Sequence, residues 1–239
     1  MTRSRNARIA GFTFLFYIGV ALPDMLVSGR ATRGADVAAR LASVAHHVTD
    51  MRVDVVLTLL SCLSALVLAA TLYAVTRDED ADVAMLGLIC RVAEGVVGAT
   101  GLAATLVLLW LATAVGTAAP DAVTTQVLGT LLFGVLGWNS TVAATFFAVG
   151  STMFSWLLLR GRMVPVALAG LGVVASVLAV IVLPLQLAGW LHGPITSLVW
   201  LPMLAFEVPL GLWLLVRGVA PLRAAGTPGG GSGDRRGAA

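Results

Sequence analysis

Six long stretches of apolar residues are the feature that most constrains how this chain folds. A helix that crosses a bilayer needs about 20 mostly apolar residues, and each stretch is about that long or longer. The stretches are far longer than the strands of a membrane barrel, and they do not alternate between apolar and polar residues. The sequence therefore predicts an all-α, polytopic integral membrane bundle of six transmembrane helices. The predicted spans are Ile9–Val27, Val53–Thr76, Val83–Val115, Asn139–Leu159, Val164–Leu185 and Ile195–Val216.

The composition agrees with this fold class. Of 239 residues, 59% are hydrophobic and only 11% are charged, whereas about one quarter of the residues in a soluble domain are charged. We therefore expect the lipid bilayer to be the main partner of the surface. The net charge of +3 is spread over termini and loops and forms no basic patch, which argues against nucleic acid as a partner.

The arginines predict the orientation of the spans. An even number of spans places both termini on one side, and all 15 basic residues are arginine. Ten of them lie on the terminal side, four lie on the opposite side, and Arg91 lies within a span. Because basic residues concentrate in cytoplasmic loops, we predict cytoplasmic termini and a location in the inner membrane of the cell.

The rest of the chain is predicted to be one domain and a tail. Residues 1–218 are expected to form the six-helix domain, and 219–239, rich in Gly, Pro, Ser and Arg, a disordered cytoplasmic tail. Thr124–Trp138 is short for a seventh span. We interpret it as a helical lead-in to the fourth span, with a bend at Gly137–Ser140. The third and fourth helices are then expected to project beyond the bilayer.

The external loop 28–52 is predicted to be partly helical. Val37, Leu41, Val44 and Val48 recur at helical spacing, with polar residues between them. Such a segment either lies along the membrane surface or caps the bundle.

Three ionisable residues lie deep within predicted spans. Arg91 and Glu94 are three residues apart in the third span and therefore share a helix face. At 1.5 Å per residue, Glu94 and Glu207 lie roughly 16 and 15 Å from the cytoplasmic ends of their spans, so they share a level near the midplane. A charge inside a span costs about 3 kcal/mol on insertion scales. Each of the three is therefore predicted to face the protein interior.

Two interpretations of this group follow from the sequence. In the first, Arg91 pairs with Glu94, Glu207 or both, and fixes the third span against the sixth. In the second, one carboxylate binds a small solute or a proton, with Arg91 as its counter-ion or as an anion clamp. One cation and two acids leave one acid unpaired, and this acid is the observation that points to the second interpretation. Pro202 and Pro209 flank Glu207 and predict a kinked helix there, as is typical of transporters.

A secondary polar group, Asp24, Arg52 and Asp54, is predicted at the external face. Charges at a membrane interface need no function, and Asp54 near a helix N-terminus is favoured by the helix dipole. We therefore expect this group to be structural.

No motif for catalysis or for a cofactor is present. The chain contains no His-Glu-x-x-His, no Gly-x-Ser-x-Gly and no phosphate-binding glycine loop, so we expect no enzyme and no cofactor. His46 with Asp50 has helical i, i+4 spacing, and His192 is on the same predicted side, but we predict no metal site. Cys62 and Cys90 lie in separate spans and imply no disulfide.

Small residues predict close helix contacts. Gly95, Gly98 and Gly101 recur along the third span, and Ser151 and Ser155 lie in the fourth. Residues of this size let membrane helices approach closely. We expect these spans to pack tightly, within the chain or between chains.

Four segments resemble one family. They are Ala7-Arg8-Ile9-Ala10-Gly11, Cys90-Arg91-Val92-Ala93-Glu94, Leu158-Leu159-Arg160 through Pro165, and Phe206-Glu207 through Gly218. Together they resemble the domain of unknown function 4386 family from about Ala7 to Gly218. The resemblance implies a bacterial six-helix membrane protein with no assigned activity and no catalytic residues to carry over. Two features depart from the family pattern. Asn139 stands where a histidine or another polar residue is expected, and the loop from Gly29 to Arg52 is unusually rich in Ala and Arg.

Overall fold

The computed structural model describes residues 2–114, 120–193 and 195–220. Within these ranges the secondary structure is helical and contains no strand. Six helices are long and apolar enough to cross a membrane, which confirms the predicted all-α, multi-pass membrane fold. Most of the predicted tail, from residue 221 on, lies outside the described residues.

Most of the spanning helices extend beyond the apolar runs at one or both ends. Polar residues cap three of them: Thr2 accepts a hydrogen bond from the Arg5 amide, Asp80 from the Val83 amide and Asp121 from the Thr124 amide. The hydrogen bonds from Thr124 lower the pKa of the Asp121 carboxyl below its usual value. The helices are α1 (Arg3–Ala31), α2 (Val37–His46), α3 (Val48–Thr76), α4 (Ala81–Thr113), α5 (Ala122–Arg160), α6 (Val166–Leu187), α7 (Ile195–Leu198) and α8 (Trp200–Val216).

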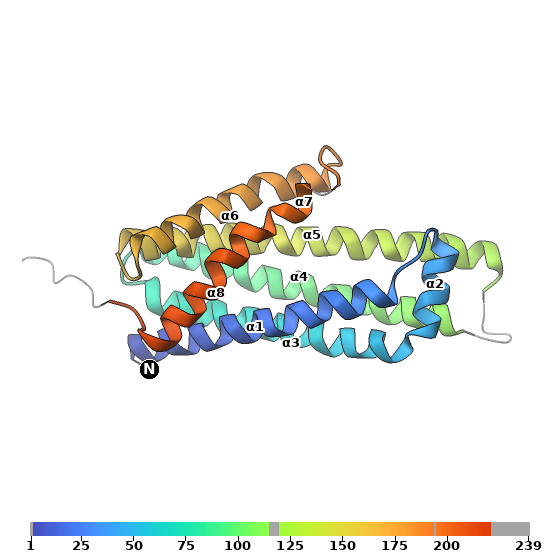
Figure 1. The fold of residues 1–239 in the computed structure, drawn as a ribbon, viewed down its shortest axis with the longest axis horizontal. Helices are drawn as coiled ribbons and strands as arrows, with labels where there is room; N and C mark the ends of the chain where they lie inside the picture. Colours follow the sequence, from blue (N-terminus) through green and yellow to red (C-terminus); the bar gives the residue numbers. More distant parts are fainter. Residues whose placement is uncertain (1, 115–119, 194, 221–239) are drawn as a thin grey trace, which may run out of the picture.

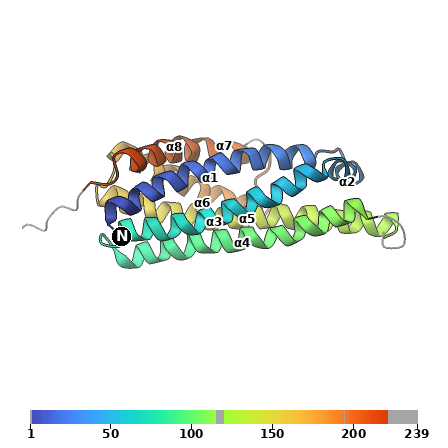
Figure 2. The ribbon, with the colours of Figure 1, turned by 90° about the horizontal axis from the view of Figure 1, so that it is seen from below.

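The six long helices form a closed ring. Each packs against the next in the order α1, α3, α4, α5, α6 and α8, and α8 packs back against α1. The views in Figures 1 and 2 show the long helices running side by side, with the described ends of the chain at one end of the bundle. We call this end the terminal end and the opposite one the α2 end. Since α4 and α8 do not pack directly against one another, residues on both can face a shared interior.

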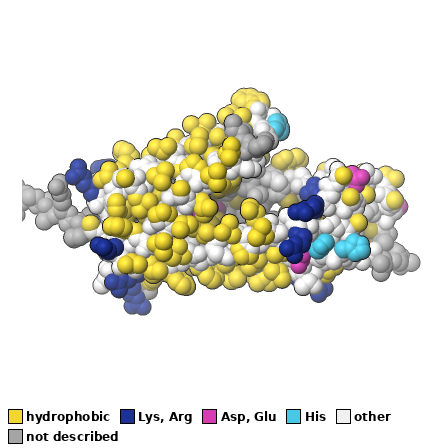
Figure 3. All heavy atoms as spheres, viewed as in Figure 1, with side chains coloured by type: hydrophobic (Ala, Val, Ile, Leu, Met, Phe, Trp, Pro, Cys, Tyr) yellow, Lys and Arg dark blue, Asp and Glu magenta, His cyan; other side chains and the backbone are white. Residues whose placement is uncertain are grey.

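The surface shows where lipid contacts the bundle. Exposed Val, Leu and Phe side chains cover the face in Figure 3, and arginines lie at both limits of this apolar region. At the terminal end, Arg160 forms ion pairs with Glu79 at 3.3 Å and Asp80 at 3.2 Å. Arg3 Nε donates to the Val75 carbonyl at 2.9 Å. These contacts fasten α1 to α3 and α5 to the start of α4.

Helix α5 is a single helix of 39 residues. At 1.5 Å per residue it is roughly 58 Å long, more than the roughly 45 Å of a bilayer with its headgroups. The expected bend at Gly137–Ser140 does not interrupt it. Trp138 and Thr141 lie level with Gln186 and His192 at the outer end of α6. Residues 122–137 therefore extend past α6, as a helix that projects beyond the other spans would.

Helix α2 caps this projection. Leu41 and Val44 are buried against Leu108 and Phe133 in a second hydrophobic core. The Arg40 guanidinium carbon lies 3.6 Å from the centre of the Phe133 ring, a close cation–π contact. Burial lowers the pKa of Arg40 below its usual value. The predicted helix is confirmed, and it packs as a cap on α4 and α5.

The sixth predicted span consists of two helices. The short α7 ends at Leu198 and α8 begins at Trp200, two residues before Pro202. Pro202 therefore occupies the first turn, where its missing amide hydrogen costs little. Pro209 lies inside α8, which continues past it. The interruption in the helix is therefore at Val199, before both prolines. The kink that the prolines predict around Glu207 stays a prediction.

The ring closes where α1 touches α8 at two glycines. A Cβ atom at Gly11 would fall within 2.6 Å of the Gly211 carbonyl oxygen and 2.9 Å of the Leu214 carbonyl carbon. These are backbone atoms, which cannot move aside as a flexible side chain can. Gly11 therefore lets the two backbones approach closely.

Replacing Gly11 by alanine tests this contact. We expect Gly11→Ala to destabilise the protein by about 1–3 kcal/mol, the usual cost of overpacking, seen as a lower melting temperature in detergent. Gly19→Ala is the matched control, because it lies on the same helix with no atom within 4 Å of the added Cβ. Equal melting temperatures for the two variants would contradict the close approach.

Candidate functional site

The centre of the candidate site is a buried arginine. Arg91 on α4 is only 1% exposed and is among the largest fully buried side chains of the described residues. Its Nη1 atom lies 2.8 Å from Oε2 of Glu94, one turn along the same helix. The contact is an ion pair without hydrogen-bond alignment, and none of the guanidinium nitrogens has a hydrogen-bond acceptor in the part of the chain that the structure describes.

Two aromatic residues complete the surroundings of the ion pair. The Arg91 guanidinium carbon lies 4.7 Å from the ring centre of Phe147 on α5 and 5.9 Å from that of Tyr17 on α1. Both distances are within the range of a cation–π interaction. The Tyr17 hydroxyl donates to Glu94 Oε1 over 3.2 Å. The ion pair on α4 is thereby connected to α1 and α5.

The stem of Arg91 fits into a gap left by Gly150 on α5. A Cβ atom at Gly150 on α5 would lie 2.8 Å from Arg91 Cγ and 3.2 Å from the Gly87 carbonyl oxygen. The absence of a side chain at Gly150 thus makes room for the arginine between α4 and α5. Of the three glycines from which the sequence predicted close packing, Gly95 and Gly98 face Cys62 on α3. Gly101 faces α5, where a Cβ atom would lie 2.8 Å from Asn139 Nδ2.

Glu207 lies in the same ring without a cation of its own. It is 6% exposed on α8, and its Oε1 atom has no hydrogen-bond partner among the described residues. No ion pair within 4 Å connects it to Arg91 in those ranges. Arg91 pairs with Glu94 inside α4, so the prediction that an ion pair fixes the third span against the sixth is not supported.

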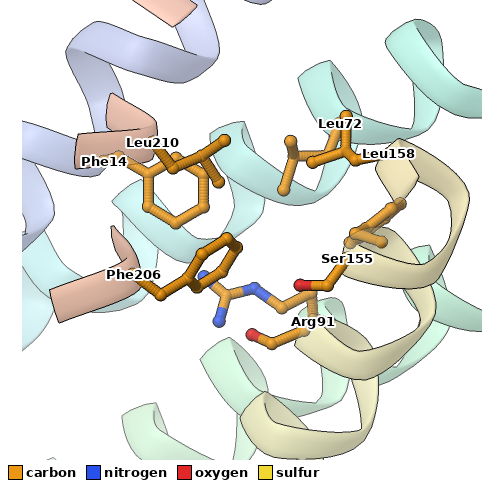
Figure 4. A pocket seen from close by; sticks show the side chains of 9 residues that line it. Phe14, Leu72, Arg91, Ser155, Leu158, Phe206 and Leu210 are labelled. Carbon is orange, nitrogen blue, oxygen red and sulfur yellow. The ribbon is translucent and has the colours of Figure 1, made fainter. Parts of the chain in front are cut away.

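A cavity of about 10 Å³ adjoins Arg91, roughly the space that one water molecule needs. Phe206 and Leu210 of α8, the neighbours of Glu207 on that helix, line it opposite Arg91, and Ser155 adds a hydroxyl from α5 (Figure 4). Arg91 therefore reaches across the ring interior toward α8.

A larger cleft of about 390 Å³ opens at the outer end of α6, between Trp138, Gln186 and His192. None of Arg91, Glu94 and Glu207 lines it. It is separate from the charged group.

The secondary polar group is only partly assembled. Asp24 on α1 accepts a hydrogen bond from Thr58 on α3 at 3.4 Å. Asp54, which is buried, lies close enough to Asp24 for the two carboxyl groups to interact electrostatically. Arg52 is exposed and forms no ion pair with either acid. The structure brings the two carboxyl groups together and leaves the arginine out.

Sequence reasoning missed Tyr17, Phe147 and Gly150. An aromatic residue or a glycine in an apolar run carries no signal of its own, because such residues are common in membrane helices. Asn139, which departs from the family pattern, has a visible role: its amide donates to the Val97 carbonyl at 3.0 Å and accepts from Thr100 at 2.9 Å. It therefore connects α5 to α4.

The described residues contain no group of three or more His, Cys, Asp or Glu side chains placed to hold a metal ion. His46, His192 and Asp50 are accordingly not brought together. Cys62 and Cys90 are both free thiols.

The family model for Domain of unknown function (DUF4386) matches residues 9–218. No curated protein and no solved structure matches the chain. Because the match covers most of the sequence, the chain belongs to this family, and the predicted resemblance is confirmed.

Removing the buried cation tests the ion pair. We expect Arg91→Met to destabilise the protein by about 3–5 kcal/mol, since it leaves two buried carboxylates without a cation, measured by thermal unfolding in detergent. The double variant Arg91→Met/Glu94→Gln should recover much of this loss, because Glu94 is the acid in direct contact. Arg91→Met/Glu207→Gln should recover less.

Arg77→Met is the control for the loss of an arginine, since Arg77 is exposed. Equal melting temperatures for the Arg91→Met and Arg77→Met proteins would contradict a stabilising role for the Arg91–Glu94 ion pair. Greater recovery with Glu207→Gln than with Glu94→Gln would contradict the assigned partner.

Proposed function

We propose that this multi-pass membrane protein binds and exchanges a proton at the midplane group of Arg91, Glu94 and Glu207, with Glu207 as the residue that takes up the proton. Within this proposal Arg91 and Glu94 form a fixed ion pair, and the arginine is the counter-charge near the acid. The protein is then not an enzyme, because proton binding needs no covalent chemistry.

The observation that carries the proposal is the unequal number of buried charges. Arg91 is in contact with Glu94 at 2.8 Å, and Glu207 is 94% buried with an unpartnered oxygen. An ionised carboxylate without a cation or donor costs several kcal/mol to bury, and a bound proton removes the charge. Intramembrane acids of this kind commonly belong to proton relays.

The size of the nearby cavity supports a proton over a bulkier solute. About 10 Å³ beside Arg91 holds roughly one water molecule. A water at this place would lie beside Arg91, whose guanidinium nitrogens lack acceptors, and beside the Ser151 and Ser155 hydroxyls. Neither Glu94 nor Glu207 lines this cavity. A sugar or an amino acid would require the helices to move apart.

The orientation and the membrane belong to the proposal as well. Arginines concentrate at the terminal end, which supports cytoplasmic termini in the inner membrane of a bacterial cell. The proton would then be exchanged between the cytoplasm and the outer side of that membrane.

Glu207→Gln tests the proposal, since glutamine resembles a neutral acid but cannot release a proton. We expect the variant to fold with an unchanged or higher melting temperature. In infrared difference spectra, the carbonyl stretch of one neutral carboxyl group should disappear. In liposomes loaded with a pH-sensitive dye, proton flux driven by a pH gradient should fall to the level of protein-free liposomes.

Asp82→Asn is the matched control, because Asp82 is an exposed acid in the first turn of α4. It should leave both the carboxyl spectrum and the flux unchanged. A folded Glu207→Gln protein with the flux of the unmodified protein would overturn the proposal.

A second candidate function is supported by the contacts of Arg91. The guanidinium contacts Glu94 and Phe147, and Tyr17 holds Glu94 from α1. In this alternative the charges only fix helix packing, and the chain is a structural or accessory membrane protein. It predicts that Glu207→Gln changes stability and leaves no proton-dependent measurement altered.

A further inference from the structure

A row of polar side chains follows the seam between α1 and α3, two helices that pack along much of their length. Asp54, Thr58 and Ser61 are four and three residues apart on α3, so they lie on one face of that helix. On α1, Asp24 and Tyr17 are seven residues apart and also share a face. The row begins near the α2 end and leads toward the ring interior.

The outer end of this row brings two carboxyl groups close together. Asp24 and Asp54 lie near enough to interact electrostatically, and a pair of neighbouring acids is a common proton-binding arrangement. The Thr58 hydroxyl on α3 donates to Asp24 at 3.4 Å. Asp24 is only half-buried, so the pair is open to exchange with the α2 end of the bundle.

The middle of the row contains buried oxygens without partners. Ser61 Oγ and Asp24 Oδ1 are both inaccessible and unpaired among the described residues. Buried polar atoms of this kind commonly bind internal water. One helical turn is about 5.4 Å, close to two successive hydrogen bonds of about 2.8 Å each through one water. A single water is therefore sufficient to connect two side chains of the row that lie one turn apart on the same helix.

The inner end of the row reaches the midplane group. The Cys62 carbonyl lies 3.1 Å from where a Cβ of Gly95 would be, so α3 touches α4 next to Glu94. Tyr17 donates to Glu94 at 3.2 Å. Because α1 also packs against α8, Tyr17 lies on the helix between the row and Glu207.

We propose that the α1–α3 seam, from the Asp24–Asp54 pair through Thr58 and Ser61 to Tyr17 and Glu94, is the path by which protons reach the midplane group from the α2 end. This inference rests on the proposed function. A proton enters at the aspartate pair, moves through hydroxyl groups and single waters, and displaces another proton at each transfer, so no other reactant is consumed. The titratable groups along the path are Asp24, Asp54, Cys62, Tyr17, Glu94 and Glu207. The cation beside the path is Arg91, which pairs with Glu94.

The experiment separates the rate of proton exchange from its extent. In liposomes containing the full chain, the pH on the α2 side is changed rapidly, and the carbonyl stretch that Glu207→Gln removes is followed over time. Asp24→Asn and Ser61→Ala should slow its appearance on the order of 10²-fold, the range for loss of one proton-transfer group. The final amplitude should be unchanged, because Glu207 itself is intact.

Asp82→Asn and Ser140→Ala are the controls, since both residues are exposed and neither lies on α1 or α3. Ser61→Ala removes only a hydroxyl group, so it remains informative if Asp24→Asn does not fold. Unchanged rates in folded Asp24→Asn and Ser61→Ala proteins, with the Glu207 signal present, would overturn the path and leave the proposed function standing. Absence of the Glu207 signal in the unmodified protein would overturn the proposed function itself.

Discussion

A guanidinium group that is 1% exposed inside a membrane bundle has to be compensated by the helices around it, because lipid offers it no partner. Four features of the ring provide this compensation. Glu94 neutralises the charge, Tyr17 holds Glu94, the Phe147 ring lies against the guanidinium, and Gly150 makes room for the stem. They come from α1, α4 and α5, so Arg91 fixes which helices surround the interior and how closely α4 and α5 approach.

The fold was largely predictable, because the length and hydrophobicity of a span are properties of a single segment. Six spans, the projecting third and fourth helices and the cap at residues 37–46 all follow from such local patterns. The partners of Arg91 were predictable only in part. Glu94 is three residues away on the same helix, whereas Tyr17 and Phe147 lie 74 and 56 residues away. Their proximity depends on the order of helices in the ring, which hydropathy does not encode.

The prolines also show what the sequence alone leaves open. Pro202 and Pro209 flank Glu207, and α8 begins just after Val199 and continues past both of them. A proline in the first helical turn loses no hydrogen bond, and a proline further on can be accommodated when neighbouring helices enclose it. Where a helix begins decides which role each proline has. In this chain that position is set by how α7 and α8 meet, not by the residues next to Glu207.

The distribution of unpartnered polar atoms separates the two ends of the bundle. At the terminal end, Arg3 and Arg160 find acceptors on neighbouring helices, as expected for contacts that hold a structure together. Apart from the Arg91–Glu94 ion pair, the buried oxygens without a partner among the described residues are Asp24 Oδ1 and Ser61 Oγ on the α1–α3 seam and Glu207 Oε1 on α8. A bundle optimised only for packing gains nothing from such atoms, since each costs about 1–3 kcal/mol. They are accounted for if water or a bound proton satisfies them, and this is the physical argument behind the proposed proton exchange.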